Sequence, residues 1–97
     1  MFASVRHYNL KPGAAAELTR RVQEEFVPII SGAPGFKAYY VLIEEPDQAV
    51  SMSVFETQAE AEDSVLLAAD WVKHSLTDLV MGPPDLTEGE VTVHKHK

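Results

Sequence analysis

Few side chains in this sequence are of a kind that does chemistry inside a buried site. Arg6 lies in a stretch of β-forming residues, and a guanidinium there offers two parallel donors to an anionic or phenolate oxygen. An ion pair with one of the fifteen Asp and Glu residues would account for Arg6 equally well. The two interpretations predict different surroundings for this side chain, and the sequence leaves both open.

Trp71 and His74 are three residues apart, about one helical turn, so their side chains can share a helix face. A histidine beside an indole could bind a flat substrate and move a proton near neutral pH. In the more common arrangement Trp71 seals a packed interface and His74 is solvated. If a reaction is catalysed, we expect Arg6 to hold an oxyanion and His74 to transfer the proton.

Tyrosines 8, 39 and 40 occur in strand-like segments and could stack on an aromatic ligand or hydrogen-bond to it. Strand tyrosines more often belong to the core, with a satisfied hydroxyl. For a cavity that binds a compact aromatic molecule, we expect these substrate contacts: Trp71, Phe55, Tyr8, Tyr40 and Ser51.

No metal site or tightly bound cofactor is expected. His94 and His96 alternate with lysines at the end of the chain, and the spacing of His7, His94 and His96 is not that of a ligand set with a carboxylate partner. There is no cysteine and no glycine-rich phosphate loop.

Length and charge limit the function classes. The 97 residues predict one domain over residues 1–97. A net charge of −7 disfavours nucleic acid and anionic lipid as partners. No run approaches the ~18 apolar residues of a membrane span, and no signal peptide is visible at the start. We therefore expect a cytoplasmic protein.

The hydrophobic periodicity predicts an α+β protein. Alternating or continuous apolar runs predict strands over residues 2–8, 36–43, 49–56 and 86–94. Helical periodicity follows the Pro-Gly break at 12–13, and a capping box opens a second helix at Thr57. The resulting order is β-α-β-β-α-β, the ferredoxin-like arrangement.

Two positions in these helices are irregular. Pro28 cannot donate to the helix ladder, which predicts a kink or a tightened last turn. Trp71 lies about 100° from the apolar stripe of the second helix. Either that helix breaks near Ala69 and Asp70, or it buries a second face. We expect Trp71 to form the lip of a pocket with His74 beside it.

Both helices of such a fold cover the same face of the sheet. The strand over 36–43 is apolar on both sides, and a chain of this length has a thin core. An uncovered apolar sheet face favours a second copy as partner. The sequence therefore predicts a homodimer in which two sheets pack face to face as a dimeric α/β barrel.

Four short motifs occur together in this order and spacing. They are Lys11-Pro12-Gly13, Pro34-Gly35-Phe36, Phe55-Glu56-Thr57 and Gly82-Pro83-Pro84. With them, the whole chain resembles the antibiotic biosynthesis monooxygenase-like (ABM) domains of the dimeric α/β-barrel superfamily. The resemblance implies relatives that include cofactor-free oxygenases of polyketide phenols and quinols, haem-degrading enzymes, and members without an established activity.

The residues of the characterised branches are mostly replaced. Where haem-degrading members carry a strand asparagine and a helix tryptophan, this chain has Arg6 and Ser64. Their iron-ligating histidine matches His74 after a shift of one residue.

The polyketide-tailoring members carry an asparagine and a tryptophan on the third strand and a tyrosine on the following helix. The matching positions here are Ser51, Phe55 and Ala61. The resemblance thus implies the fold and the pocket location. From it we expect a cofactor-independent monooxygenase or related small enzyme acting on a compact aromatic, quinol-like substrate. The alternative is a non-catalytic small-molecule-binding or stress-related dimer.

Overall fold

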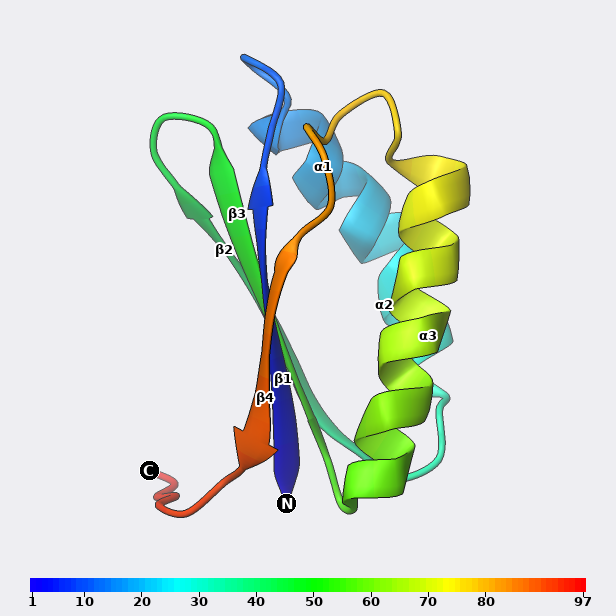
Figure 1. Ribbon diagram of the computed structural model, residues 1–97, viewed down its shortest axis with the longest axis vertical. Coiled ribbons are helices and arrows are strands. Elements are labelled where there is room, and N and C mark those ends of the chain that lie inside the picture. Colours follow the sequence, from blue (N-terminus) through cyan, green and yellow to red (C-terminus); the bar gives the residue numbers. More distant parts are fainter.

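The computed structural model describes residues 1–97 as a four-stranded antiparallel sheet with all helices on one face (Figure 1). The elements are β1 (Phe2–Asn9), α1 (Ala15–Arg21), the π-helical segment η1 (Val22–Phe26), α2 (Val27–Ser31), β2 (Phe36–Glu44), β3 (Gln48–Phe55), α3 (Gln58–Ser75) and β4 (Asp85–Glu90). The strands lie in the order β2-β3-β1-β4. This order confirms the predicted ferredoxin-like fold.

The two central strands carry small and polar side chains toward the helices. Alternate residues of β1 are buried, so Ser4, Arg6 and Tyr8 face α3 and the first helical segments. On β3, Ser51 lies directly opposite Arg6, and Ser53 lies opposite Ser4. The helix-facing side of the sheet therefore combines an apolar core with a row of buried polar groups.

The two apolar sides of β2 have different surroundings. A bulge between Phe36 and Ala38 changes the alternation at the start of the strand. Beyond it, Tyr39 packs against the buried core. Tyr40 and Leu42 point to the helix-free face, where 58% and 56% of their surfaces are exposed.

The first helix is distorted near Pro28, as predicted, but the distortion is a widening. Residues 22–26 form a π-helical segment. The backbone N–H of Val27 donates to the carbonyl of Val22, five residues back. Because Pro28 has no N–H to continue an ordinary ladder, the chain tolerates an extra residue in the preceding turn. A tightened turn was the wrong expectation.

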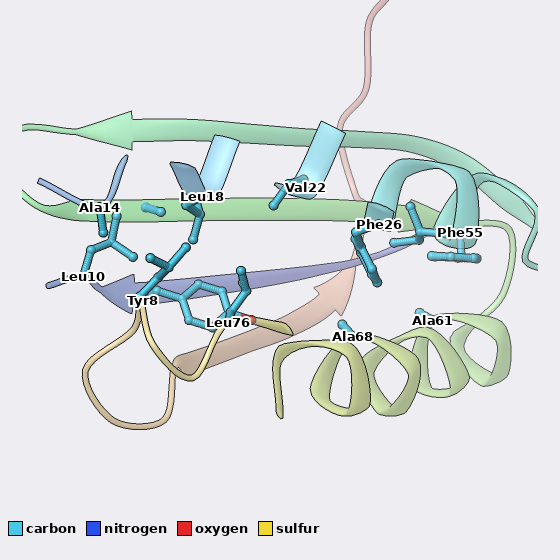
Figure 2. Close-up of a cluster of buried hydrophobic side chains, with 13 residues drawn as sticks. Tyr8, Leu10, Ala14, Leu18, Val22, Phe26, Phe55, Ala61, Ala68 and Leu76 are labelled. Carbon is cyan, nitrogen blue, oxygen red and sulfur yellow. The ribbon is translucent and has the colours of Figure 1, made fainter. Parts of the chain in front are cut away.

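The second helix, α3, runs unbroken from Gln58 to Ser75. It opens on the predicted capping box, in which Thr57 and Glu60 each bond the other's backbone N–H. Ala61 and Ala68 point toward the sheet (Figure 2). Of the two alternatives, the break near residue 70 is wrong, because the helix is continuous there.

The last strand, β4, is shorter than the predicted 86–94, and residues 91–97 form no regular structure. The buried core lies between the sheet and the helices (Figure 2), with Phe26, Ile30 and Phe55 almost fully enclosed. The opposite face carries no helix (Figure 1). We call it the open face and define it by these apolar residues: Val5, Tyr40, Leu42, Val50 and Met52. No helix has the length and apolarity needed to cross a bilayer.

Candidate functional site

Arg6 lies beneath the helices at the boundary of two adjoining cavities, with only 3% of its surface exposed. The inner cavity lies between the sheet and the helices. It is lined mainly by apolar residues, and Tyr8, Tyr39, Ser51 and Trp71 complete its wall. Its volume of ≈ 20 Å³ is enough for about one water molecule.

The outer cavity lies between α3 and the start of β4. It shares Arg6, Tyr8 and Val72 with the inner cavity. Lys73 of α3 and Leu86 of β4 complete its opposite sides, and its volume is ≈ 200 Å³. A compact ligand therefore has space beside Arg6 in the outer cavity, whereas the inner cavity takes only a very small molecule.

The Arg6 guanidinium has no partner on its buried side. Its Nε and Nη2 atoms are enclosed and make no hydrogen bond. None of the ion pairs in the chain involves Arg6. Its burial without an acidic neighbour excludes the ion-pair interpretation within this chain. An unsatisfied buried charge is costly, so this arrangement points to a ligand.

The two tyrosines of the inner cavity are proton donors rather than bases. Burial raises the pKa of Tyr39 to about 12, against the opposing effect of the Arg6 charge. Burial also raises the pKa of Tyr8, again opposed by Arg6. Both phenols therefore stay protonated near neutral pH and can donate to an oxyanion.

The structure brings four of the predicted site residues together. Arg6, Tyr8, Ser51 and Trp71 all line the inner cavity. The indole of Trp71 packs against the ring of Phe26, with 5.0 Å between the ring centroids. Trp71 thus closes the cavity on the α3 side, and it also contacts the core.

The structure does not bring His74 to either cavity. Its side chain is 68% exposed, and its Nδ1 atom lies 2.8 Å from the carbonyl oxygen of Asp70 on the same helix. One turn separates Trp71 from His74, but the helix turns the indole inward and the imidazole toward solvent. We therefore leave His74 out of the proposed site.

Two further predicted contacts lie elsewhere. Phe55 is fully buried and packs against Phe36, with 5.9 Å between the ring centroids, and it lines neither cavity. Tyr40 belongs to the open face, on the far side of the sheet from Arg6. Because successive strand residues point to opposite faces, its neighbour Tyr39 takes the position in the cavity.

Sequence reasoning missed two elements of this site. Lys73 was not considered, although it directly follows Val72 on the cavity side of α3. The π-helical segment supplies Val22 and Phe26 to the inner wall. Pro28 was the only sequence signal for that segment.

The residues present do not fit a haem. His74, the one candidate iron ligand, is exposed and lies outside both cavities. The inner cavity has no space for a macrocycle. We therefore derive no step through a haem.

Comparisons with known proteins agree with this fold. The structure superposes on a protein of unknown function from Nitrosomonas europaea with a TM-score of 0.81 and 21% identity, covering 99% of this chain and 93% of that one. A MhuD variant with two manganese protoporphyrin IX molecules per active site gives 0.79 and 17% identity, covering 100% of both chains. A Streptomyces coelicolor monooxygenase in complex with nanaomycin D gives a TM-score of 0.74 and 16% identity, covering 99% of this chain and 91% of that one.

At these identities the superpositions show the fold alone. No curated protein matches the sequence. The family model for antibiotic biosynthesis monooxygenase matches residues 1–65, which include Arg6, Tyr8 and Ser51. The chain belongs to the antibiotic biosynthesis monooxygenase family.

Proposed function

We propose that this protein is a cofactor-independent monooxygenase, or a related small enzyme, acting on a compact aromatic, quinol-like substrate. One observation carries the proposal: the buried Arg6, which has no acidic partner in this chain, lines a ligand-sized cavity. Family membership supports the same reaction class. In a related fold, the S. coelicolor monooxygenase was solved with a small organic molecule, nanaomycin D.

In this proposal Arg6 holds the substrate as an oxyanion. A preorganised cation in a dry cavity stabilises negative charge far more than water does. The oxyanion pushes electron density onto a ring carbon, which passes an electron to O₂ and then forms a C–O bond. The resulting peroxide takes up a proton and breaks its O–O bond. One oxygen atom stays as a carbonyl, and the other leaves as water together with the hydrogen lost from carbon.

The two cavities suit the two reactants of this reaction. The aromatic substrate would occupy the outer cavity, with its oxyanion at Arg6. The inner cavity has a volume of ≈ 20 Å³ and a mainly apolar lining, so a diatomic gas molecule would fit in it. Tyr8 lines both cavities and would donate a hydrogen bond near the reacting atoms.

A non-catalytic binding protein is the second candidate. The observation that favours it is the exposure of His74, which leaves both cavities without an imidazole or a carboxylate to accept a proton. Such a protein would use Arg6 to retain a ligand without turning it over.

We also propose that the protein works as a homodimer that buries the open face. Tyr40 and Leu42 are more than half exposed there, and Val5, Val50 and Met52 are partly exposed. A monomer would leave this continuous apolar surface in water.

Oxygen uptake with a panel of anthrones and naphthohydroquinones tests the enzymatic proposal. We expect uptake above the autoxidation rate and one ¹⁸O atom per product molecule from ¹⁸O₂. Arg6→Met and Trp71→Ala should each lower kcat/KM by tenfold or more. His74→Ala is the matched control and should retain both activity and melting temperature. Ligand binding without uptake by any member of the panel would favour the non-catalytic candidate.

A further inference from the structure

The charges around Arg6 are one-sided. The outer cavity is lined by Arg6 and Lys73, two of only eight Lys and Arg residues in the chain. None of the fifteen Asp and Glu residues lines either cavity. In a chain whose net charge is −7, a site with two cations and no carboxylate selects an anion.

Arg6 acts on a ligand through its charge rather than through its Nε–Nη2 edge. Both of these atoms are enclosed by the protein and closed to water, so the oxygen atoms of a ligand in the outer cavity do not reach that edge. The attraction of the cavity for an anion is therefore electrostatic, with Arg6 and Lys73 as its sources.

No group at the site can take a proton from a neutral ligand. Besides Arg6 and Lys73, the ionisable groups that line the cavities are Tyr8 and Tyr39. A guanidinium and an ammonium have no free lone pair, and both tyrosines are protonated phenols held so by burial. His7 points to the open face, where it bonds Gln48 at 3.0 Å. The negative charge must therefore arrive with the ligand.

We infer that the ligand of this site is an apolar monoanion that enters already ionised and places its negative charge between Arg6 and Lys73. A carboxylate and the enolate of a 2-hydroxyquinone both meet this description. The apolar body would lie against Val65, Ala69 and Leu86 in the outer cavity. The inference deepens the proposed function, since a quinol-like substrate would bind as its monoanion, and it rests on that proposal only for the location of the site.

Trp71 is the only tryptophan and lines the inner cavity, which shares Arg6, Tyr8 and Val72 with the outer one, so its fluorescence should change when a ligand binds. The first pair of probes is 2-hydroxy-1,4-naphthoquinone, ionised at neutral pH, and 2-methoxy-1,4-naphthoquinone, which has the same rings and no charge. The second pair is 2-naphthoate and 2-naphthamide, measured by calorimetry. We expect at least one anion to bind tenfold or more tightly than its neutral counterpart.

Substitutions test whether Arg6 causes the preference for the anionic probe. Arg6→Met removes the charge at similar volume and should abolish the discrimination between anion and neutral probe. Arg6→Lys keeps the positive charge and should retain the discrimination. Arg20→Met is the matched control: it removes one positive charge from the surface and should leave the discrimination unchanged. Circular dichroism confirms that each variant is folded.

Equal binding of both members in both probe pairs would overturn the inference, whether or not any variant folds. A preference that survives Arg6→Met would overturn it as well. Preferential anion binding without oxygen uptake would uphold the inference while the oxygenase proposal fails. Oxygen uptake together with equal binding of neutral and anionic probes would uphold the oxygenase proposal while the inference fails.

Discussion

At the scale of single residues, the free guanidinium of Arg6 is the clearest departure from ordinary packing. A buried polar group without a partner destabilises a protein by about 1–3 kcal/mol, and by more when it is charged. Natural proteins keep such groups where function requires them, at a cost in stability. Arg6 therefore links a stability measurement to the site.

We expect Arg6→Met to raise the free energy of unfolding of the ligand-free protein by about 1–3 kcal/mol, because it removes the unsatisfied charge at similar volume. Urea denaturation of both proteins measures the difference. The same substitution at the exposed Arg20 removes satisfied hydrogen bonds to Glu17 and Glu24 and should give no stabilisation. A loss of stability in Arg6→Met would mean that Arg6 is a structural residue.

At the scale of elements, the π-helical segment η1 shapes the inner cavity. Val22 and Phe26, its first and last residues, both line that cavity. A wide turn displaces side chains from their usual angular positions, and such segments occur often at functional sites. Phe26 also contacts Tyr39, with 5.5 Å between ring centroids, so this turn connects the helices to β2 across the cavity.

The start of α3 depends on a glycine in the loop before β2. Gly35 has a φ of +77°, and an added Cβ would collide with the carboxylate of Glu60, which completes the capping box. Gly13 has a similar φ of +80° with open space around it. Gly13→Ala should therefore cost only the backbone strain of about 1–2 kcal/mol.

Gly35→Ala should cost that strain plus about 1 kcal/mol for the lost cap. Thermal unfolding of the two variants, followed by circular dichroism, isolates the contribution of the collision. Equal losses in both variants would show that Glu60 moves aside freely.

Ion pairs on the surface of α1 make the stability of the protein depend on pH. Hydrogen bonds from Arg20 and then Arg21 lower the pKa of Glu17 from its ordinary 4.5 to about 2. Between these values the unfolded chain binds a proton that the folded protein does not, so stability is full above pH 4.5 and is lost as the pH falls toward 2. Arg21 also bonds Asp78, beyond α3.

The melting temperature should therefore fall between pH 4.5 and pH 2, and Glu17→Gln should show a smaller fall. Glu25, on the same helical stretch, makes no ion pair, so Glu25→Gln serves as the control. Identical pH profiles for wild type and Glu17→Gln would show that Glu17 does not cause the pH dependence.

Local patterns in the sequence were sufficient to predict the order of the strands and helices, although β4 ends earlier than predicted. Strict alternation placed Arg6 and Tyr8 on one face, and the capping box marked the start of α3. The predicted contact Tyr40 lies on the open face and Tyr39 lines the cavity, because β2 is apolar on both sides and only the tertiary structure decides which side meets the helices. Helical spacing likewise could not show that His74 points to solvent.

At the scale of the whole molecule, the open face is the largest feature without an explanation inside one chain. We expect light scattering at micromolar concentration to give twice the mass of the chain. Leu42→Glu, on the open face, should yield monomers because it would bury two charges in the interface. Leu66→Glu is the matched control, since Leu66 is 70% exposed on α3. A wild-type mass of one chain would contradict the dimer.

The uneven charge of the molecule also affects how fast a ligand arrives. A small anion in bulk solvent approaches a chain with a net charge of −7 and meets Arg6 and Lys73 only within the outer cavity. The long-range force is therefore repulsive and the short-range force attractive. Salt at 0.1 M screens forces beyond about 10 Å, so it weakens the repulsion first. Moderate ionic strength should thus increase the association rate of an anion, whereas salt usually slows the association of oppositely charged partners.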